Sequence, residues 1–348
     1  MILMTRYLIL TCILSLLLIV TVPAAALELA DEPEIIYTAE EFNIVRAVTD
    51  GTSVLINTDY PFPKTGSRGE GNLHIYSIAE KTLTTIPDTE NILPWDTRLS
   101  GDDVFWQVTR YLDSYNVTYD VYHYSISSGK TTRLDTDKLP KTGTDYYLSL
   151  KPAGGSDPYA VIITAENIKT GDKHIISMPE AADAWTVKIS GDAMAFSDMP
   201  EKGGKSMYLY NFTTRQTTTL DTVADGTVTV LGFSKDTLMY CRETGSKQFY
   251  LMDIPTKQVK HISDSSMNCD ETDLDGTLAV WRGWYWNDDF TVPNRIATPL
   301  YAASFDDTDT PVLLDTGVRQ PSVRNNIVVW SKWDDTLERD TVRLAKLK

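Results

Sequence analysis

The chain has 348 residues, of which 42% are hydrophobic, 10% aromatic and 23% charged. These proportions are typical of a folded soluble protein and exclude a largely disordered chain. The formal net charge is −16 at pH 7, and a surface of that sign repels nucleic acid, so we expect no nucleic-acid partner.

The first 26 residues predict a signal peptide. Arg6 supplies a positive charge, residues 8–22 form an almost unbroken apolar run, and residues 23–26 are small residues suited to cleavage. The run is about 15 residues long, short of the roughly 20 needed to cross a bilayer, so cleavage is favoured over a retained anchor. We therefore expect an exported protein, extracellular, periplasmic or at the cell surface, with no transmembrane span in residues 27–348.

A repeat with a period of 42 to 51 residues runs through the remaining chain. Each copy has a short apolar strand, a polar turn rich in Thr, Gly or Lys, and a second short strand ending in an aliphatic residue. In chain order, the apolar residue before each turn is Ile78, Ile126, Ile168, Phe212, Ile254 and Phe305. Regular spacing of this length is typical of propellers and solenoids.

A tight polar turn followed by a strand of β-branched and aromatic residues precedes each of these units. In chain order, the turns begin at Thr49, Ser100, Gly143, Ser190, Ser234, Asp275 and Asn325. Gly, Asp and Asn suit such turns because they tolerate positive φ or bond their own backbone. The series predicts an all-β, seven-bladed β-propeller of four-stranded antiparallel blades, with the third blade least regular near Leu139-Pro140.

The last blade lacks a fourth strand at its own end of the chain. Residues 327–333 and 341–347 have strand character, and no strand follows them. Residues 34–38 also read as a strand, so we expect them to pair with the C-terminal strand and close the ring, which removes exposed sheet edges. No long helical periodicity is present, so residues 27–348 are expected to form a single domain.

The repeat resembles a known propeller family. A Ser/Asp/Gly turn, an apolar-aromatic strand and the segment from Tyr124 to Lys130 (Tyr-Ser-Ile-Ser-Ser-Gly-Lys) are similar to the TolB-like, WD40-like repeats of prokaryotic cell-envelope proteins. The chain departs from WD40 repeats, since it has no Trp-Asp pair at the repeat position, and no turn carries the full Ser-Pro-Asp-Gly. The resemblance implies a propeller fold and a protein-binding habit, and it transfers no functional residues.

Cys241 and Cys269 are the cysteines left after cleavage, and an even pair in an exported chain predicts a disulfide. Closing a loop of about 27 residues stabilises a fold by roughly 3 to 4 kcal/mol in the chain-entropy model. Two buried free thiols are the alternative.

Carboxylates gather before one of the repeat turns. Asp270, Glu271, Asp273 and Asp275 offer the oxygen ligands that Ca²⁺ prefers. The alternative is that the turn itself explains Asp275, because an acid and a glycine suit its backbone. No other cofactor is predicted, and no catalytic residue is named, because the Gly-x-Ser-x-Gly pattern of a serine hydrolase is absent.

Consecutive aromatic residues at Trp284, Tyr285 and Trp286 predict a binding surface. Strand side chains alternate between faces, so the three rings cannot all be buried with Trp281 between blades. An exposed aromatic cluster suits a protein or glycan partner. Asn116-Val117-Thr118 and Asn211-Phe212-Thr213 fit the N-glycosylation pattern, so Asn116 and Asn211 are candidate acceptors.

Two functions remain open. The first is a non-catalytic module that binds a protein or glycan at the cell envelope. The second is a propeller enzyme, a hydrolase or lyase, working in the central channel, where the innermost strands would present Arg46, Asp96, Arg98, Asp270 and Asp273. The oligomeric state is not predicted by any feature of the sequence.

Overall fold

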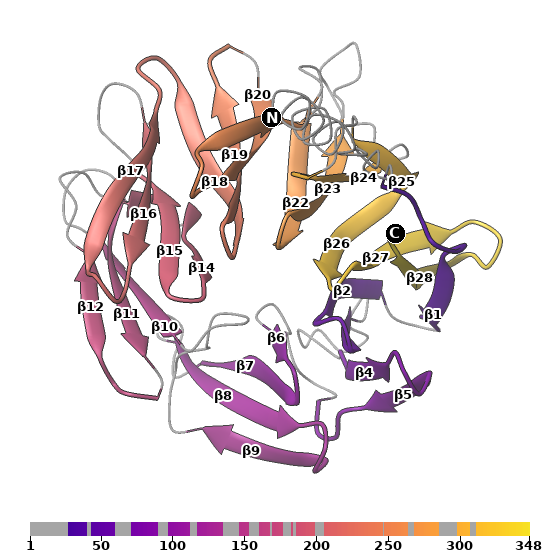
Figure 1. Cartoon of the computed structure of the whole chain (residues 1–348). Helices are drawn as coiled ribbons and strands as arrows, with labels where there is room; N and C mark the ends of the chain where they lie inside the picture. The colour runs from indigo at the N-terminus through magenta and orange to yellow at the C-terminus, as the bar shows by residue number, and fades with distance from the viewer. Residues whose placement is uncertain are drawn as a thin grey trace, which may run out of the picture.

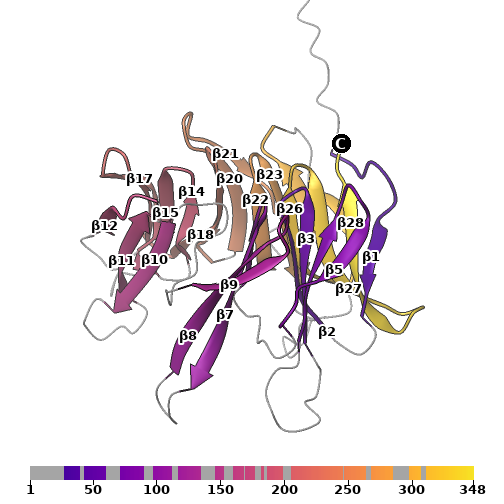
Figure 2. The same ribbon diagram turned by 90° about the horizontal axis from the view of Figure 1, so that it is seen from below.

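The structure, a computed structural model, describes residues 27–39, 43–59, 71–89, 97–111, 117–134, 146–152, 160–167, 169–176, 182–183, 186–198, 205–245, 247–263, 268–284, 298–306 and 311–348. Seven antiparallel sheets of four strands stand around a central axis as the blades of a propeller (Figures 1 and 2). The predicted all-β, seven-bladed fold is confirmed. The described part of the chain contains no helix that is long and apolar enough to cross a membrane.

Blades 1 to 3 come first along the chain and contain β2 to β13. Blade 1 contains β2 (Asn43–Thr49), β3 (Ser53–Asp59), β4 (Leu73–Ser77) and β5 (Thr82–Thr85). Blade 2 contains β6 (Thr97–Ser100), β7 (Asp103–Tyr111), β8 (Val117–Ser125) and β9 (Lys130–Leu134). Blade 3 contains β10 (Tyr146–Pro152), β11 (Ala160–Asn167) and β12 (Lys173–Ile176), with β13 (Ala182–Asp183) also paired to β11.

Blades 4 to 7 follow in the same order from the axis outward. Blade 4 contains β14 (Lys188–Ser190), β15 (Ala193–Ser197), β16 (Ser206–Asn211) and β17 (Gln216–Thr222). Blade 5 contains β18 (Thr227–Ser234), β19 (Thr237–Glu243), β20 (Lys247–Asp253) and β21 (Gln258–His261). Blade 6 contains β22 (Asn268–Asp275), β23 (Leu278–Trp284), β24 (Leu300–Ser304) and β25 (Val312–Asp315). Blade 7 contains β26 (Val318–Arg324), β27 (Ile327–Asp334), β28 (Arg339–Lys346) and β1 (Glu34–Thr38).

The strand nearest the N-terminus completes the blade that holds the C-terminus. β1 pairs antiparallel with β28, from Glu34 opposite Leu344 to Thr38 opposite Thr341. β28 is therefore paired on both edges, and no unpaired edge of that strand is left to recruit another chain. The predicted closure of the ring is confirmed.

Large apolar side chains fill the space between neighbouring blades. Trp106 packs with Leu55 between blades 1 and 2, and Trp281 packs with Met239 between blades 5 and 6. Trp281 also stacks on Tyr301, with the ring centroids 5.8 Å apart. Both indoles are at most 1% exposed, and the predicted burial of Trp281 between blades is confirmed.

The first residue of three of the polar turns ties one blade to the next. The Ser190 hydroxyl accepts the backbone N–H of Lys235 at 2.7 Å, and the Ser234 hydroxyl accepts that of Gly276 at 2.8 Å. Asp275 Oδ2 accepts the N–H of Asn325 at 2.7 Å in the same way. These bonds join blades 4 to 5, 5 to 6 and 6 to 7, so the Ser or Asp at this place does more than shape its own turn.

Candidate functional site

The innermost strands surround a cavity of 530 Å³ at the centre of the ring, here named the central channel. Its described lining comes from β2, β6, the β14 segment, β18, β22 and β26. The residues before β10 in blade 3 lie outside the described part of the chain. A volume of this size falls within the range of about 300 to 1,000 Å³ found for small-molecule sites.

Sheet register places one residue from each inner strand in a common layer. In five blades the residue two positions before the end of the inner strand has a partner directly opposite it in the second strand of the blade. These inner residues are Arg98, Lys188, Gly232, Asp273 and Ser322, opposite Phe105, Ala195, Met239, Val280 and Val329 respectively. Blade 1 differs, since the residue two before the end of β2 is Ala47, opposite Ile56. The layer therefore carries cations on blades 2 and 4 and a carboxylate on blade 6.

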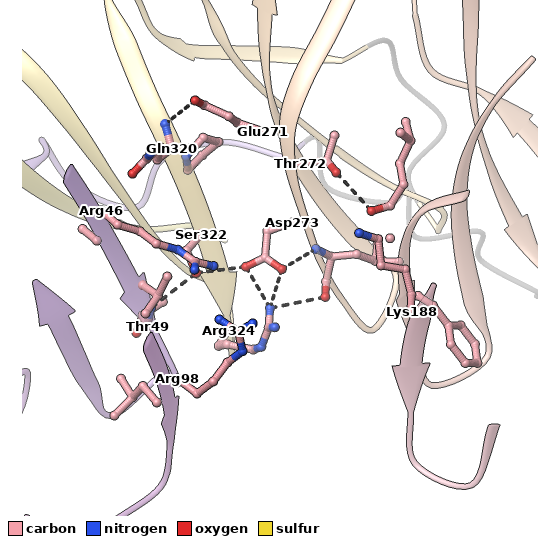
Figure 3. A pocket seen from close by; sticks show the side chains of 18 of the residues that line it. Arg46, Thr49, Arg98, Lys188, Glu271, Thr272, Asp273, Gln320, Ser322 and Arg324 are labelled. Carbon is pink, nitrogen blue, oxygen red and sulfur yellow. Dashed lines mark hydrogen bonds and ion pairs between the residues drawn. The ribbon is translucent and has the colours of Figure 1, made fainter. Parts of the chain in front are cut away.

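Asp273 is fully engaged by donors from its own and the next blade (Figure 3). Its Oδ2 accepts the Ser322 hydroxyl and the Val323 N–H, both at 2.9 Å, and its Oδ1 accepts the Leu274 N–H at 2.9 Å. Arg324 Nη1 donates to Oδ1 at 2.9 Å and to Oδ2 at 3.0 Å. Burial alone would lower the pKa of Arg324, but Asp273 outweighs it and the pKa is raised. Asp273 thus clamps blade 6 to blade 7.

Glu271 and Gln320 form a second contact between these blades. Glu271 Oε2 accepts the backbone N–H of Gln320 at 2.6 Å and lies 3.2 Å from Arg282 Nε. Both residues stand at β-bulges, and each has a φ of +48°. Positive φ in a residue other than glycine costs about 1 to 3 kcal/mol and gathers at functional sites, as bulges do.

Among the described residues that line the channel, Lys188 is a cation without a counterion. It makes no hydrogen bond or ion pair with any residue that the structure describes. Burial lowers the pKa of its ammonium group; the charge of Asp273 opposes this effect and that of Arg98 adds to it. A half-buried ammonium group without a partner is costly, and an anion beside it would stabilise its charged form.

The described lining of the channel is positive, although the protein is acidic. Its described lining includes Arg46, Arg98, Lys188 and Arg324 against Glu271 and Asp273. Both carboxylates already accept bonds from basic side chains. The protein has a net charge of −16, so this concentration of cations is a local feature, and a cleft with low-dielectric walls strengthens its field.

The structure brings together part of the predicted channel set. Arg46, Arg98 and Asp273 all line the channel. Asp96 lies outside the described residues, and so does the side chain of Asp270. The backbone of Asp270 lies in β22 and pairs with Arg282 of β23. The sequence analysis did not select Lys188, Gln320 or Arg324. A signal for Lys188 was present, since it precedes Ser190-Gly191-Asp192 by the spacing that separates Arg98 from Ser100-Gly101-Asp102.

The predicted calcium ligands are occupied by protein donors where they are described. Glu271 and Asp273 hold the bonds given above, and Asp275 accepts the N–H of Asn325. Among the described residues, no group of three or more His, Cys, Asp or Glu side chains is arranged to hold a metal ion. The side chain of Asp270 is not among them, and calcium binding stays a prediction.

Three further predictions fall wholly or partly outside the described residues. Trp284 ends β23, but its side chain and residues 285–297 are not described. The Cys241 side chain is buried, and burial raises the pKa of its thiol to about 11. The side chain of Cys269 is not described, so the disulfide stays a prediction. Asn116 is not described; Asn211 ends β16, and its Oδ1 accepts the Thr214 N–H at 2.7 Å.

No protein-family model matches the chain, and no curated protein matches its sequence. Solved propeller structures do match its fold. The β-propeller domain of the Trilobed protease from Pyrococcus furiosus superposes with a TM-score of 0.60 at 10% identity, covering 87% of this chain and 95% of that one. An acylaminoacyl peptidase from Pyrococcus horikoshii matches with a TM-score of 0.60 at 11% identity over 84% of this chain. This chain spans only 49% of that peptidase.

TolB from Acinetobacter baumannii is also similar in fold. Its TM-score is 0.44 at 12% identity, with 88% of this chain and 79% of that chain covered. At these identities the comparisons define a class, the seven-bladed β-propellers, and no function. The resemblance to TolB-like repeats stays a prediction.

Proposed function

We propose that this protein is an exported, non-catalytic binding propeller whose central channel receives an anionic group of a glycan or protein at the cell envelope. The observation that carries the proposal is Lys188, a half-buried ammonium with no counterion among the described residues, beside Arg98 in a channel whose described carboxylates are already bonded. Export rests on the pattern of the first 26 residues.

The chemistry of the lining favours an acidic ligand over a neutral one. A neutral sugar would leave the positive charge of Lys188 without an opposite charge. A carboxylate would supply that charge and accept hydrogen bonds from the ammonium group. Carboxylated sugars and acidic side chains both provide such a group, and each is small enough for a channel of 530 Å³.

Titration calorimetry on the full chain after signal-peptide removal tests the proposal. The probes are galacturonate and sulfate, with galactose as the neutral counterpart of galacturonate. We expect at least one anion to bind with one-to-one stoichiometry, galactose not to bind, and Lys188→Met to weaken binding about tenfold or more, since bonds to charged groups contribute about 1.5 to 3 kcal/mol. Equal binding by Lys188→Met, or no binding by either anion, would contradict it.

A propeller enzyme in the same channel is the second candidate. Lys188 favours it as well, because a lysine whose pKa is lowered by burial gives up its proton more readily and serves as a general base. The two candidates differ in the fate of the ligand. A binding module returns the bound sugar acid unchanged after prolonged incubation, whereas a hydrolase or lyase converts an oligomer of it to shorter products that mass spectrometry detects.

A further inference from the structure

The hairpin between β27 and β28 carries an exposed tryptophan beyond the body of blade 7. Of the four tryptophan side chains described, Trp106, Trp281 and Trp330 are at most 1% exposed, whereas Trp333 is 45% exposed. Leu337, in the turn of the same hairpin, is also 45% exposed. Two large apolar side chains at one tip are a costly feature of a soluble surface unless a partner covers them.

Sheet register explains why this tip is uncovered. β26 pairs with β27 only as far as Lys332, and β1 pairs with β28 only as far as Thr341. The segment from Trp333 to Arg339 therefore extends past both neighbouring strands, and the hairpin projects from the rim of the ring (Figures 1 and 2).

The tip is held in a fixed conformation by Asp334. Its Oδ1 accepts the N–H groups of Thr336 at 3.0 Å and Leu337 at 3.1 Å, and its Oδ2 accepts Arg343 at 2.7 Å. The bond from Leu337 is the largest cause of the lowered pKa of this carboxyl, so it stays ionised and keeps the turn closed at neutral pH. A turn ordered in advance loses little conformational freedom on binding, which favours affinity.

Acidic side chains surround the two apolar ones. Asp335 and Glu338 are exposed and make no ion pair with a described residue, whereas Asp334 is paired with Arg343. Arg339 is the exposed cation of the same segment, so two unpaired acids outnumber one unpaired base. An anionic lipid surface would be repelled by this tip, as would a second acidic copy of the chain. A protein surface with an apolar recess and a rim of Lys or Arg would match it in both shape and charge.

We propose that the β27–β28 tip, Trp333 and Leu337 with Asp335 and Glu338, docks into a basic-rimmed apolar recess of a protein partner. This surface is separate from the central channel and does not depend on the ligand proposed there. Trp333 is the anchor, and the two acids set orientation and the rate of encounter.

Photo-crosslinking in cells that export the protein, followed by measurement with the purified partner, tests the proposal. A benzoylphenylalanine placed at Trp333 should give one discrete protein adduct, and the same label at Val259, which is 46% exposed on β21, should not. The adduct partner, purified, should bind the wild type with an affinity that falls with salt. Trp333→Ala should weaken binding roughly 30-fold, and an Asp335→Lys, Glu338→Lys double variant should reduce the association rate about tenfold.

Three results would overturn the proposal. They are crosslinks to lipid or to a second copy, the same adduct from both label positions, and binding by the purified partner that is indifferent to Trp333→Ala and to the charge reversals. A Leu313→Ala variant, which removes another exposed apolar side chain, is the control for folding and should bind as the wild type does.

Discussion

Lys188 is where stability and binding are expected to oppose each other. Burial lowers the pKa of Lys188 in the folded state, so the unfolded chain holds this proton more tightly. The free energy of unfolding therefore falls as pH drops from about 10.5, the ordinary pKa of lysine, to the lower pKa of the folded state. At neutral pH the charged group therefore destabilises the fold. Lys188→Met should raise the thermal midpoint while weakening anion binding about tenfold or more. A lower midpoint in calorimetric scans would show that Lys188 is instead a structural residue.

His74 makes stability depend on pH in the acid range. It is 9% exposed, its Nδ1 lies 3.0 Å from the Thr85 hydroxyl, and burial lowers its pKa from 6.5. Below pH 6.5 the unfolded chain takes up a proton that the folded chain resists, so the free energy of unfolding falls by at most about 1.4 kcal/mol per pH unit from this group. His74→Gln should remove that part of the slope between pH 7.5 and 5.5 in urea titrations, and an unchanged slope would contradict the assignment.

At the scale of elements, the inter-blade bonds at the polar turns should contribute measurable stability. Ser234→Ala leaves the Gly276 N–H without its acceptor, which costs about 1 to 3 kcal/mol where water cannot replace it. Ser128→Ala is the matched control, because the Ser128 hydroxyl bonds within its own hairpin, to Ser125. Urea unfolding should show a loss for Ser234→Ala that exceeds the loss for Ser128→Ala. Equal losses would show that the tie between blades 5 and 6 is energetically unimportant.

The aromatic run after β23 remains a candidate binding element. A Trp284→Ala, Trp286→Ala double variant should keep its fold, because the rings cannot all share the face that buries Trp281. Binding to cell-wall material or to a captured partner should fall about tenfold or more if these rings form contacts. Unaltered binding by a folded double variant would return the run to a packing role.

The elements of the fold were predictable from the sequence because their signals are local. The 42 to 51 residue period, the Ser-Gly-Asp turns and the strand character of residues 34–38 each depend on neighbouring residues, and they led to the correct blade number and closure. The channel was predictable only in part. Arg46, Arg98 and Asp273 were selected by their place on inner strands, whereas the isolation of Lys188 and the engagement of Asp273 depend on contacts between blades that no local pattern contains.

At the scale of the whole molecule, an acidic protein surrounds a channel whose described lining is positive. The net charge is −16, yet the described lining of the channel has more cations than carboxylates. At physiological ionic strength the Debye length is about 8 Å, so distant exterior charges are screened and the local charges of Lys188 and Arg98 govern what enters. Closure by β1 pairs the two ends of the described chain within blade 7, which favours a preorganised site at the centre of the ring.

Anomalous diffraction from crystals soaked in selenate tests the central claim, an anion site in the channel, most directly. Selenate is an oxyanion whose selenium atom can be located without reference to the rest of the density. The account predicts a peak in the channel with an oxygen about 3 Å from Lys188 Nζ, on the side of the channel that Arg98 lines, and no such peak in crystals of Lys188→Met. Selenate bound only on the outer surface, or a channel peak that persists in Lys188→Met, would contradict it.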